Sequence, residues 1–167
     1  RERDNLLGEY ELLMGFTKYN DIVKMSQHHK KASRLLTGCS CILDTHSSWT
    51  FASPSILALF HREVGKLSQE VQVMQSSMPY YYGITANHGS GAESVMEVEV
   101  AFCCGKIDEA EVAVHRAVYQ AVQASQWNIW LCAVFLQCRI ALFQGNFEAV
   151  LSALQQVRAE VMDNNRF

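Results

Sequence analysis

The sequence predicts an all-α chain, a tetratricopeptide-like α-solenoid of about four helical hairpins with a period of about 40 residues. Two prolines and nine glycines in 167 residues are too few for the turns of a sandwich or a barrel. A glycine followed two residues later by a large apolar residue recurs at Gly65, Gly105 and Gly145, at equal intervals of 40 residues. Apolar residues after the last two glycines step by three and four positions, which is the spacing of one helix face.

The first predicted hairpin begins with a helix over Leu6–Tyr19 and turns near Asn20, because asparagine tolerates the left-handed backbone that glycine supplies in the other copies. Its second helix carries a weak stripe at Ile22, Met25, His29, Ala32 and Leu36. A long link over 37–53, TGCSCILDTHSSWTFAS, follows this hairpin. Links of this length are usually functional or disordered, and Trp49 and Phe51 argue against disorder.

The second predicted hairpin begins with a helix over Pro54–Val64, because proline suits the first turn of a helix, and turns at Gly65. Its second helix carries the stripe Leu67, Glu70, Met74, Ser77 and Tyr81. The three successive tyrosines 80–82 cannot share one face, since each residue rotates by about 100°. We expect Tyr81 to be buried and at least one other tyrosine to face the glycine-containing link over 82–91, or the groove.

The third and fourth predicted hairpins begin with helices over Ala92–Cys104 and Trp127–Gln144, which end before Gly105 and Gly145. The helices that follow carry two stripes related by 40 residues: Ile107, Ala110, Val114, Ala117 and Ala121, then Phe147, Val150, Leu154, Val157 and Val161. Small residues recur at tetratricopeptide spacing, although the standard unit has about 34 residues. Because one hairpin cannot cover its own apolar face, the hairpins are expected to stack.

Composition limits the classes of function. The chain is 49% hydrophobic and 19% charged, which suits a single folded domain over 1–167. Its net charge of −3 argues against direct nucleic-acid binding. The longest apolar run, 129–136, has eight residues and is too short for a membrane span, so we expect a cytoplasmic protein. The chain begins without methionine inside apparent helical sequence, and we expect a fragment of a larger protein.

No motif of a metal site or an enzyme is present. The six cysteines lack paired C-x-x-C spacing and lie mostly in apolar helical sequence, which predicts reduced, buried thiols with no disulfide and no metal. The dipeptides Gly65-Lys66 and Gly105-Lys106 lack the rest of a phosphate-binding loop. Neither G-x-S-x-G nor H-E-x-x-H occurs. We therefore expect no catalytic residues, no cofactor and no enzymatic activity.

Four short stretches carry a resemblance to a known family: WTFASPS at 49–55, FHRE at 60–63, MPYYY at 78–82 and HGSGAE at 88–93. From about Asn20 to Ala149 the chain resembles the helical-repeat region of LuxR-type bacterial transcription regulators related to the maltose regulator MalT. The resemblance implies a repeat superhelix that senses an inducer, between a nucleotide-dependent switch domain and a helix-turn-helix. It therefore implies that the ATPase and DNA-binding domains lie elsewhere in the full-length protein.

The sequence predicts that a small-molecule inducer or a protein partner binds the concave face, where the two irregular links flank the second hairpin. The candidate ligand-binding residues are Trp49, Phe51, His61, Arg62, Tyr82, His88 and Glu93. The two aromatic residues of the first link would supply stacking surface and the others hydrogen bonds, with Arg62 suited to a carboxylate or phosphate. Two alternatives stay open: these side chains only clip the links, or the chain is a constitutive protein-interaction scaffold without a small ligand.

Overall fold

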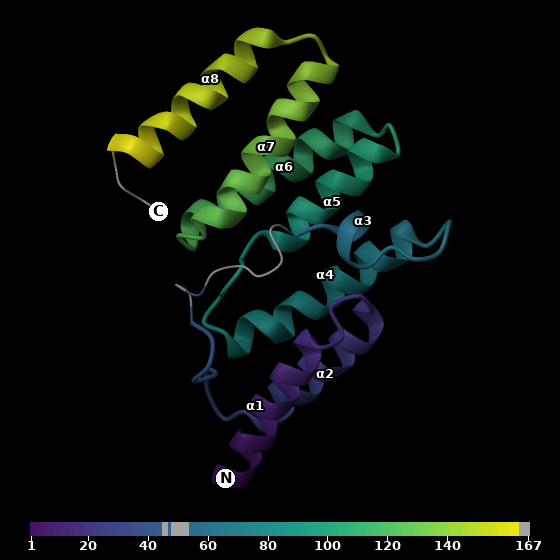
Figure 1. Ribbon diagram of the computed structural model, residues 1–167, viewed down its shortest axis with the longest axis vertical. Coiled ribbons are helices and arrows are strands. Elements are labelled where there is room, and N and C mark those ends of the chain that lie inside the picture. Colours follow the sequence, from purple (N-terminus) through teal and green to yellow (C-terminus); the bar gives the residue numbers. More distant parts are fainter. Residues whose placement is uncertain (45–46, 48–53, 164–167) are drawn as a thin grey trace.

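The computed structural model describes residues 1–44, 47 and 54–163, and this part of the chain forms helices, turns and loops with no β-strand. The predicted all-α class is therefore confirmed for the described part. Its helices are α1 (Glu2–Phe16), α2 (Ile22–Leu35), α3 (Ile56–Leu59), α4 (Leu67–Ile84), α5 (Ala92–Cys103), α6 (Ile107–Gln123), α7 (Trp127–Phe143), α8 (Phe147–Arg158) and the π-helical turn η1 (Ala159–Asp163). They follow one another along the long axis of the molecule, from α1 and α2 at one end to α8 at the other (Figure 1).

Each long helix packs on the next long helix of the chain, in the order α1, α2, α4, α5, α6, α7 and α8. The predicted turns after α1 and before α4, α6 and α8 are all present. Gly65, Gly105 and Gly145 have φ values of 84°, 73° and 73°, in the left-handed region where glycine avoids the strain of a side chain. The 40-residue register of glycines therefore marks backbone positions that need glycine.

Three turns, spaced 20 residues apart, end α5, α6 and α7 with the same backbone hydrogen bonds. At the first turn, the N–H of Lys106 donates to the carbonyl oxygen of Ala101 at 2.9 Å, as in a Schellman motif. The same bond recurs after Ser125 and after Gly145, at 2.8 Å in each case. The glycine register does not predict the turn at Ser125, which has φ 53°, because serine does not mark left-handed backbone.

The second hairpin corrects one prediction. The sequence predicts a helix over Pro54–Val64, but α3 is a single turn over Ile56–Leu59. The guanidinium of Arg62 donates to the carbonyl oxygens of Leu59 and His61, both at 2.8 Å, so a side chain pairs with carbonyls at this helix end. Because α3 is so short, α4 packs mainly against α2 of the preceding hairpin and against α5.

The start of α3 is held by a carboxylate from a distant part of the chain. Glu99 of α5 accepts hydrogen bonds from the Ser55 hydroxyl at 2.6 Å and from the Ile56 N–H at 2.7 Å. It also accepts from the Leu57 N–H at 3.2 Å, so it pairs with free donors of the first turn. Hence α5 fixes where α3 lies at the edge of the stack.

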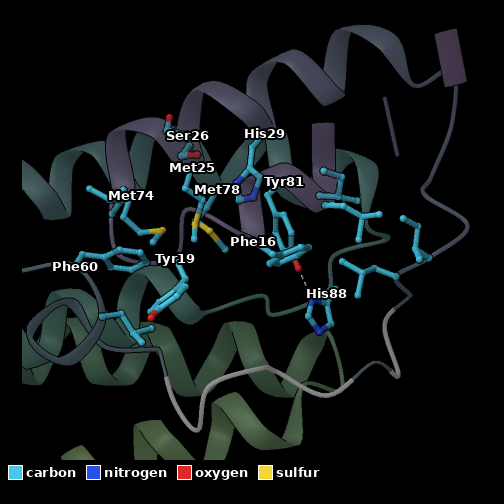
Figure 2. Close-up of a pocket in the computed structure, with 17 residues that line it drawn as sticks. Phe16, Tyr19, Met25, Ser26, His29, Phe60, Met74, Met78, Tyr81 and His88 are labelled. Atoms are coloured by element: carbon cyan, nitrogen blue, oxygen red, sulfur yellow. Dashed lines mark hydrogen bonds between the residues drawn. The ribbon is translucent and has the colours of Figure 1, made fainter. Parts of the chain in front are cut away.

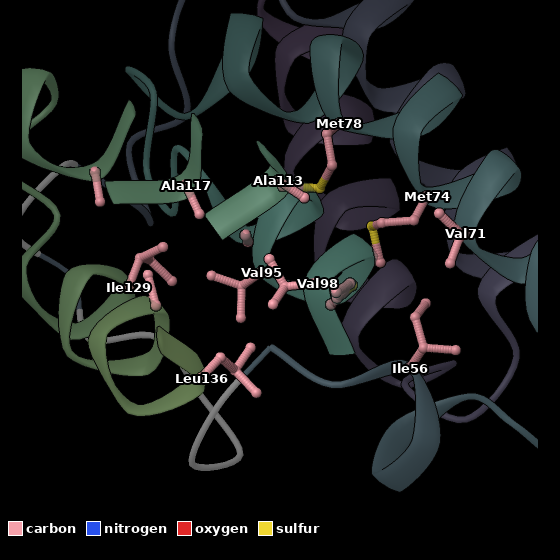
Figure 3. Close-up of a cluster of buried hydrophobic side chains, with 14 of the residues drawn as sticks. Ile56, Val71, Met74, Met78, Val95, Val98, Ala113, Ala117, Ile129 and Leu136 are labelled. Atoms are coloured by element: carbon pink, nitrogen blue, oxygen red, sulfur yellow. The ribbon is translucent and has the colours of Figure 1, made fainter. Parts of the chain in front are cut away.

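A hydrophobic core runs through the stack (Figure 3). Figure 3 shows it as a continuous cluster from Ile56 of α3 to Leu136 of α7. The most deeply buried helix is α5, where Val95, Met96 and Val98 are at most 2% exposed. Burying a side chain of this size contributes about 1.5 to 3 kcal/mol. Helix α5 is therefore the centre of the core.

The buried face of α6 consists largely of small side chains. Four alanines on this face have no exposed surface: Ala110, Ala113, Ala117 and Ala121. Gly91, at the start of α5, has φ 98°, and a Cβ atom there would lie 3.1 Å from the carbonyl oxygen of Ala117. Small residues on both sides therefore permit the close approach of α5 and α6.

The stripe predicted for the last helix is not buried as the corresponding stripe of α6 is. Phe147 and Leu154 are 66% and 54% exposed, whereas Ala153 is buried. Within the described chain, α8 packs on α7 and η1. The apolar face of α8 that repeats the α6 stripe is therefore open.

We expect Ala117→Leu to lower the free energy of unfolding by about 1 to 3 kcal/mol, because the added atoms meet the closely packed backbone around Gly91. Chemical denaturation of both proteins measures the change. Val112→Leu, at a 64% exposed position of the same helix, is the matched control and should leave stability nearly unchanged. Equal stability of wild type and Ala117→Leu would contradict the packing described for α6.

Candidate functional site

An apolar pocket of about 240 Å³ lies where α1, α2 and α4 meet (Figure 2). The loops that follow α2 and α3 complete its wall. Its aromatic and sulfur-containing lining comes from Phe16, Tyr19, Met25, Phe60, Met74 and Met78. The pocket therefore lies where the incomplete second hairpin meets the first.

His29 of α2 lines this pocket and is 4% exposed. Its ring lies 5.0 Å from the Tyr81 ring and 6.1 Å from the Phe16 ring, centroid to centroid. Gly15 of α1 makes room for it, because a Cβ atom there would lie 2.9 Å from His29 Cδ2. Burial, and then the charge of His28, lowers the pKa of His29 to about 4, so the ring is neutral at pH 7. Its Nε2 has no hydrogen-bond partner in the described part of the chain.

Ser77 of α4 lines the same pocket and is 2% exposed. Its hydroxyl oxygen also has no hydrogen-bond partner among the described residues. The neighbouring Ser76 is exposed and donates to the carbonyl oxygen of Val73 at 2.9 Å. Buried hydroxyls are normally paired, and an unpaired one costs about 1 to 3 kcal/mol. The pocket wall thus contains two polar groups whose bonding capacity is unused within the described chain.

A buried hydrogen-bond chain lies at one end of the pocket. The Tyr81 hydroxyl lies 2.6 Å from His88 Nδ1, and His88 Nε2 lies 2.8 Å from the carbonyl oxygen of Ser47 (Figure 2 shows the first contact). Burial raises the pKa of Tyr81, so its hydroxyl keeps its proton and donates to Nδ1. Nε2 of His88 then carries the proton and donates to Ser47. The link at Ser47 is thereby attached to α4.

Two of the predicted ligand residues, His61 and Arg62, lie beside the start of α4. His61 Nδ1 is 2.8 Å from the Glu70 carboxylate, and Arg62 binds the carbonyl oxygens after α3. Arg62 also lines an open polar cleft of about 610 Å³, together with Lys18 and Lys24. This cleft is mixed in charge, since Glu63 and Glu70 lie in it too.

Two others, Tyr82 and Glu93, bind each other at the far end of α4. The Tyr82 hydroxyl donates to the Glu93 carboxylate and, at 3.1 Å, to the carbonyl oxygen of Gly89. Gln120 of α6 donates to the second carboxylate oxygen of Glu93 at 3.0 Å. Burial, with the nearby Glu93 charge, raises the pKa of Tyr82. These contacts tie α4, α5 and α6 together.

Of the three remaining predicted site residues, the structure describes one, His88. His88 is 3% exposed and, among the predicted site residues that the structure describes, only His88 lines the apolar pocket. Trp49 and Phe51 lie outside the described residues. Since the described residues of the set lie at both ends of α4, a ligand-binding role for the whole set stays a prediction.

His29 and Ser77 are not among the site residues predicted from the sequence. Both were included in the helical stripes of their hairpins, where apolar residues are expected. A polar side chain at a stripe position can indicate a binding site. The position implies burial, and a buried polar group needs a hydrogen-bond partner. Glu70, also a polar member of a stripe, has its partner in His61.

The prediction of buried thiols is wrong for the four exposed cysteines, because these lie in loops or on outer helix surfaces: Cys39, Cys41, Cys103 and Cys104. In the described ranges, no three histidine, cysteine or carboxylate side chains are grouped as metal ligands would be. Of the helices that the structure describes, none combines the length and the apolar character needed to cross a membrane.

No protein-family model, curated protein or solved structure matches the chain.

We expect the stability of the protein to fall as the pH decreases from about 6.5 to about 4, in part because of His29. The folded state holds this ring neutral while the unfolded chain takes up a proton in that window, which costs up to about 3 kcal/mol. Urea unfolding at several pH values measures the loss.

His29→Leu should show a smaller loss of stability over the same window, because the titrating group is absent. His115→Leu, which removes an exposed histidine of α6, is the control and should keep the wild-type slope. Identical slopes for wild type and His29→Leu would show that His29 is not held neutral by burial.

Proposed function

We propose that this chain is a tetratricopeptide-like α-solenoid that binds a small-molecule effector in the apolar pocket between α1, α2 and α4. The serial packing of the long helices and the three Schellman turns at intervals of 20 residues support the solenoid. The resemblance to LuxR-type regulators related to MalT supports an effector-sensing role in transcription regulation, inside the cytoplasm. In such a regulator the ATPase and DNA-binding functions belong to other domains.

The observation that carries the proposal is a pocket of about 240 Å³ whose lining residues include two that each have a buried polar atom without a partner in the described chain. The pocket is partly open, and apolar lining that stays in contact with water costs roughly 25 cal/mol per Å² of uncovered apolar surface. An unpaired buried polar atom adds its own cost. A ligand that fills the space and pairs these atoms removes both costs.

The position of the pocket suits a sensor. Its walls come from both helices of the first hairpin and from α4, so a ligand contacts two consecutive units of the stack at once. A ligand shifts a conformational equilibrium of a protein only if it binds the two conformations with different affinities. Here the affinity exists only while α1 and α2 lie against α4, so bound ligand favours that arrangement of the first hairpin.

A constitutive protein-interaction scaffold is the second candidate function. The exposed apolar face of α7 and α8 favours it, with Phe143, Phe147, Leu151 and Leu154 between 54% and 68% exposed. Exposed apolar residues of this number commonly mark an interaction surface. The two functions differ in whether a small ligand enters the pocket of the first hairpin.

Ser77→Leu tests the sensing function, because the leucine side chain occupies pocket volume that a ligand would need. We expect small apolar fragments to bind wild type in ligand-observed NMR and to lose binding to Ser77→Leu. The melting temperature of this variant should stay at or above that of wild type, since a cavity is filled and an unpaired hydroxyl removed.

Ser76→Leu is the matched control, because this adjacent position of α4 is exposed and does not line the pocket. It should bind the fragments as wild type does. If no fragment binds wild type, or if binding is the same in both variants, the sensing function is wrong and the scaffold is favoured.

A further inference from the structure

We propose that the ligand of this pocket is an uncharged, largely apolar molecule of about two fused rings with one hydrogen-bonding group, which pairs with Ser77 or His29. The inference rests on the proposed function and specifies its ligand class.

The size of the ligand follows from the volume of the pocket. An apolar cavity of about 150 Å³ in a protein core takes up benzene. The present pocket, at about 240 Å³, has room for a second ring. The methionine side chains of its wall adapt to the shape of a guest, and the aromatic rings supply flat contact surface.

The absence of charge in the ligand follows from the lining. No Asp, Glu, Lys or Arg side chain is among the described residues that line the pocket. A charged ligand would lose its hydration without gaining an ionic partner, which is costly. With the pKa of His29 near 4, this ring offers no positive charge at pH 7 to a carboxylate or phosphate.

The hydrogen-bonding group follows from the two unpaired atoms. A neutral imidazole nitrogen either donates or accepts, depending on its tautomer, and a serine hydroxyl does both. A ligand hydroxyl or amide suits either side chain once that side chain turns toward the ligand, because both atoms are closed to solvent as the structure places them. A water molecule bound to either atom would leave most of the pocket unfilled, since the other walls are largely apolar.

Three probes that share one ring system separate these requirements. Naphthalene has the apolar body alone, 2-naphthol adds a neutral hydroxyl, and 2-naphthoate adds a charge. By equilibrium dialysis at pH 7 we expect 2-naphthol to bind one site per chain about tenfold more tightly than naphthalene, which corresponds to about 1.4 kcal/mol of hydrogen bonding. We expect 2-naphthoate to bind at least about tenfold more weakly than 2-naphthol.

Methionine methyl resonances locate the bound probe. Met25, Met74 and Met78 line the pocket, whereas Met162 is 72% exposed on η1. In spectra of protein labelled at the methionine methyl groups, 2-naphthol should shift the first three resonances and leave that of Met162 unchanged.

Variants test the two anchors separately. Ser77→Ala and His29→Leu should each lower the affinity for 2-naphthol toward that of naphthalene, about threefold to tenfold, while changing the affinity for naphthalene less than about twofold. Ser76→Ala should change neither affinity. Ser77→Ala removes one buried oxygen only, so it remains informative if His29→Leu is unstable.

The outcomes separate this inference from the proposed function. Equal affinity for naphthalene and 2-naphthol, with both lost in Ser77→Leu, would overturn the polar anchors and leave the sensing pocket in place. Tightest binding by 2-naphthoate would overturn the uncharged class. If no probe shifts the pocket methionines, and the fragments of the preceding test also fail to bind, the proposed function fails together with this inference.

Discussion

The close approach of α6 to its neighbours is the constraint on which the regular part of the stack depends. The buried face of α6 carries alanines, so α5 and α7 approach each other across it and make contacts of their own. The large side chains of that region come from the flanking helices, as with Trp130 of α7, which is 1% exposed. Because Gly91 lies against the α6 backbone, the start of α5 is fixed as well. Helices α6 and α7 then have 17 residues each, and both end in the same turn as α5.

This regularity is lost at the second hairpin, and the pocket lies at that place. A full-length helix in the position of α3 would supply a row of side chains against α2 and α4. The structure instead has one helical turn there, and loop residues such as Ile42 and Phe60 complete the wall. Loops cover the gap between helices less completely than a packed helix does, so space remains between the first hairpin and α4.

The sequence predicted those features that depend on local backbone chemistry. The turns at Gly65, Gly105 and Gly145 require left-handed backbone, which glycine supplies. The helical stripes identified the buried faces of α2, α4 and α6 but not that of α8. The length of α3 was not predictable in this way, because Glu99 and Arg62 set its ends through contacts that no local pattern records. Tertiary contacts of this kind override local propensity.

For the site, the stripe pattern predicted burial but not hydrogen bonding. His29, Ser77 and Glu70 all occupy stripe positions, and the sequence does not tell which of them finds a partner. The structure pairs Glu70 with His61 and leaves His29 Nε2 and Ser77 Oγ without partners in the described chain. The distinction depends on three helices from separate parts of the sequence, so only the packed structure reveals it.

The two unpaired atoms connect stability with function in the proposed sensor. Each costs about 1 to 3 kcal/mol without a partner, and one lies on α2 of the first hairpin while the other lies on α4. A ligand that bonds to them and fills the apolar space stabilises that arrangement by an amount that grows with its concentration. Apolar residues at these two positions would make the packed arrangement more stable but independent of the ligand. In the proposed sensor, polar residues at these two positions would thus make the packing of the first hairpin on α4 responsive to an effector.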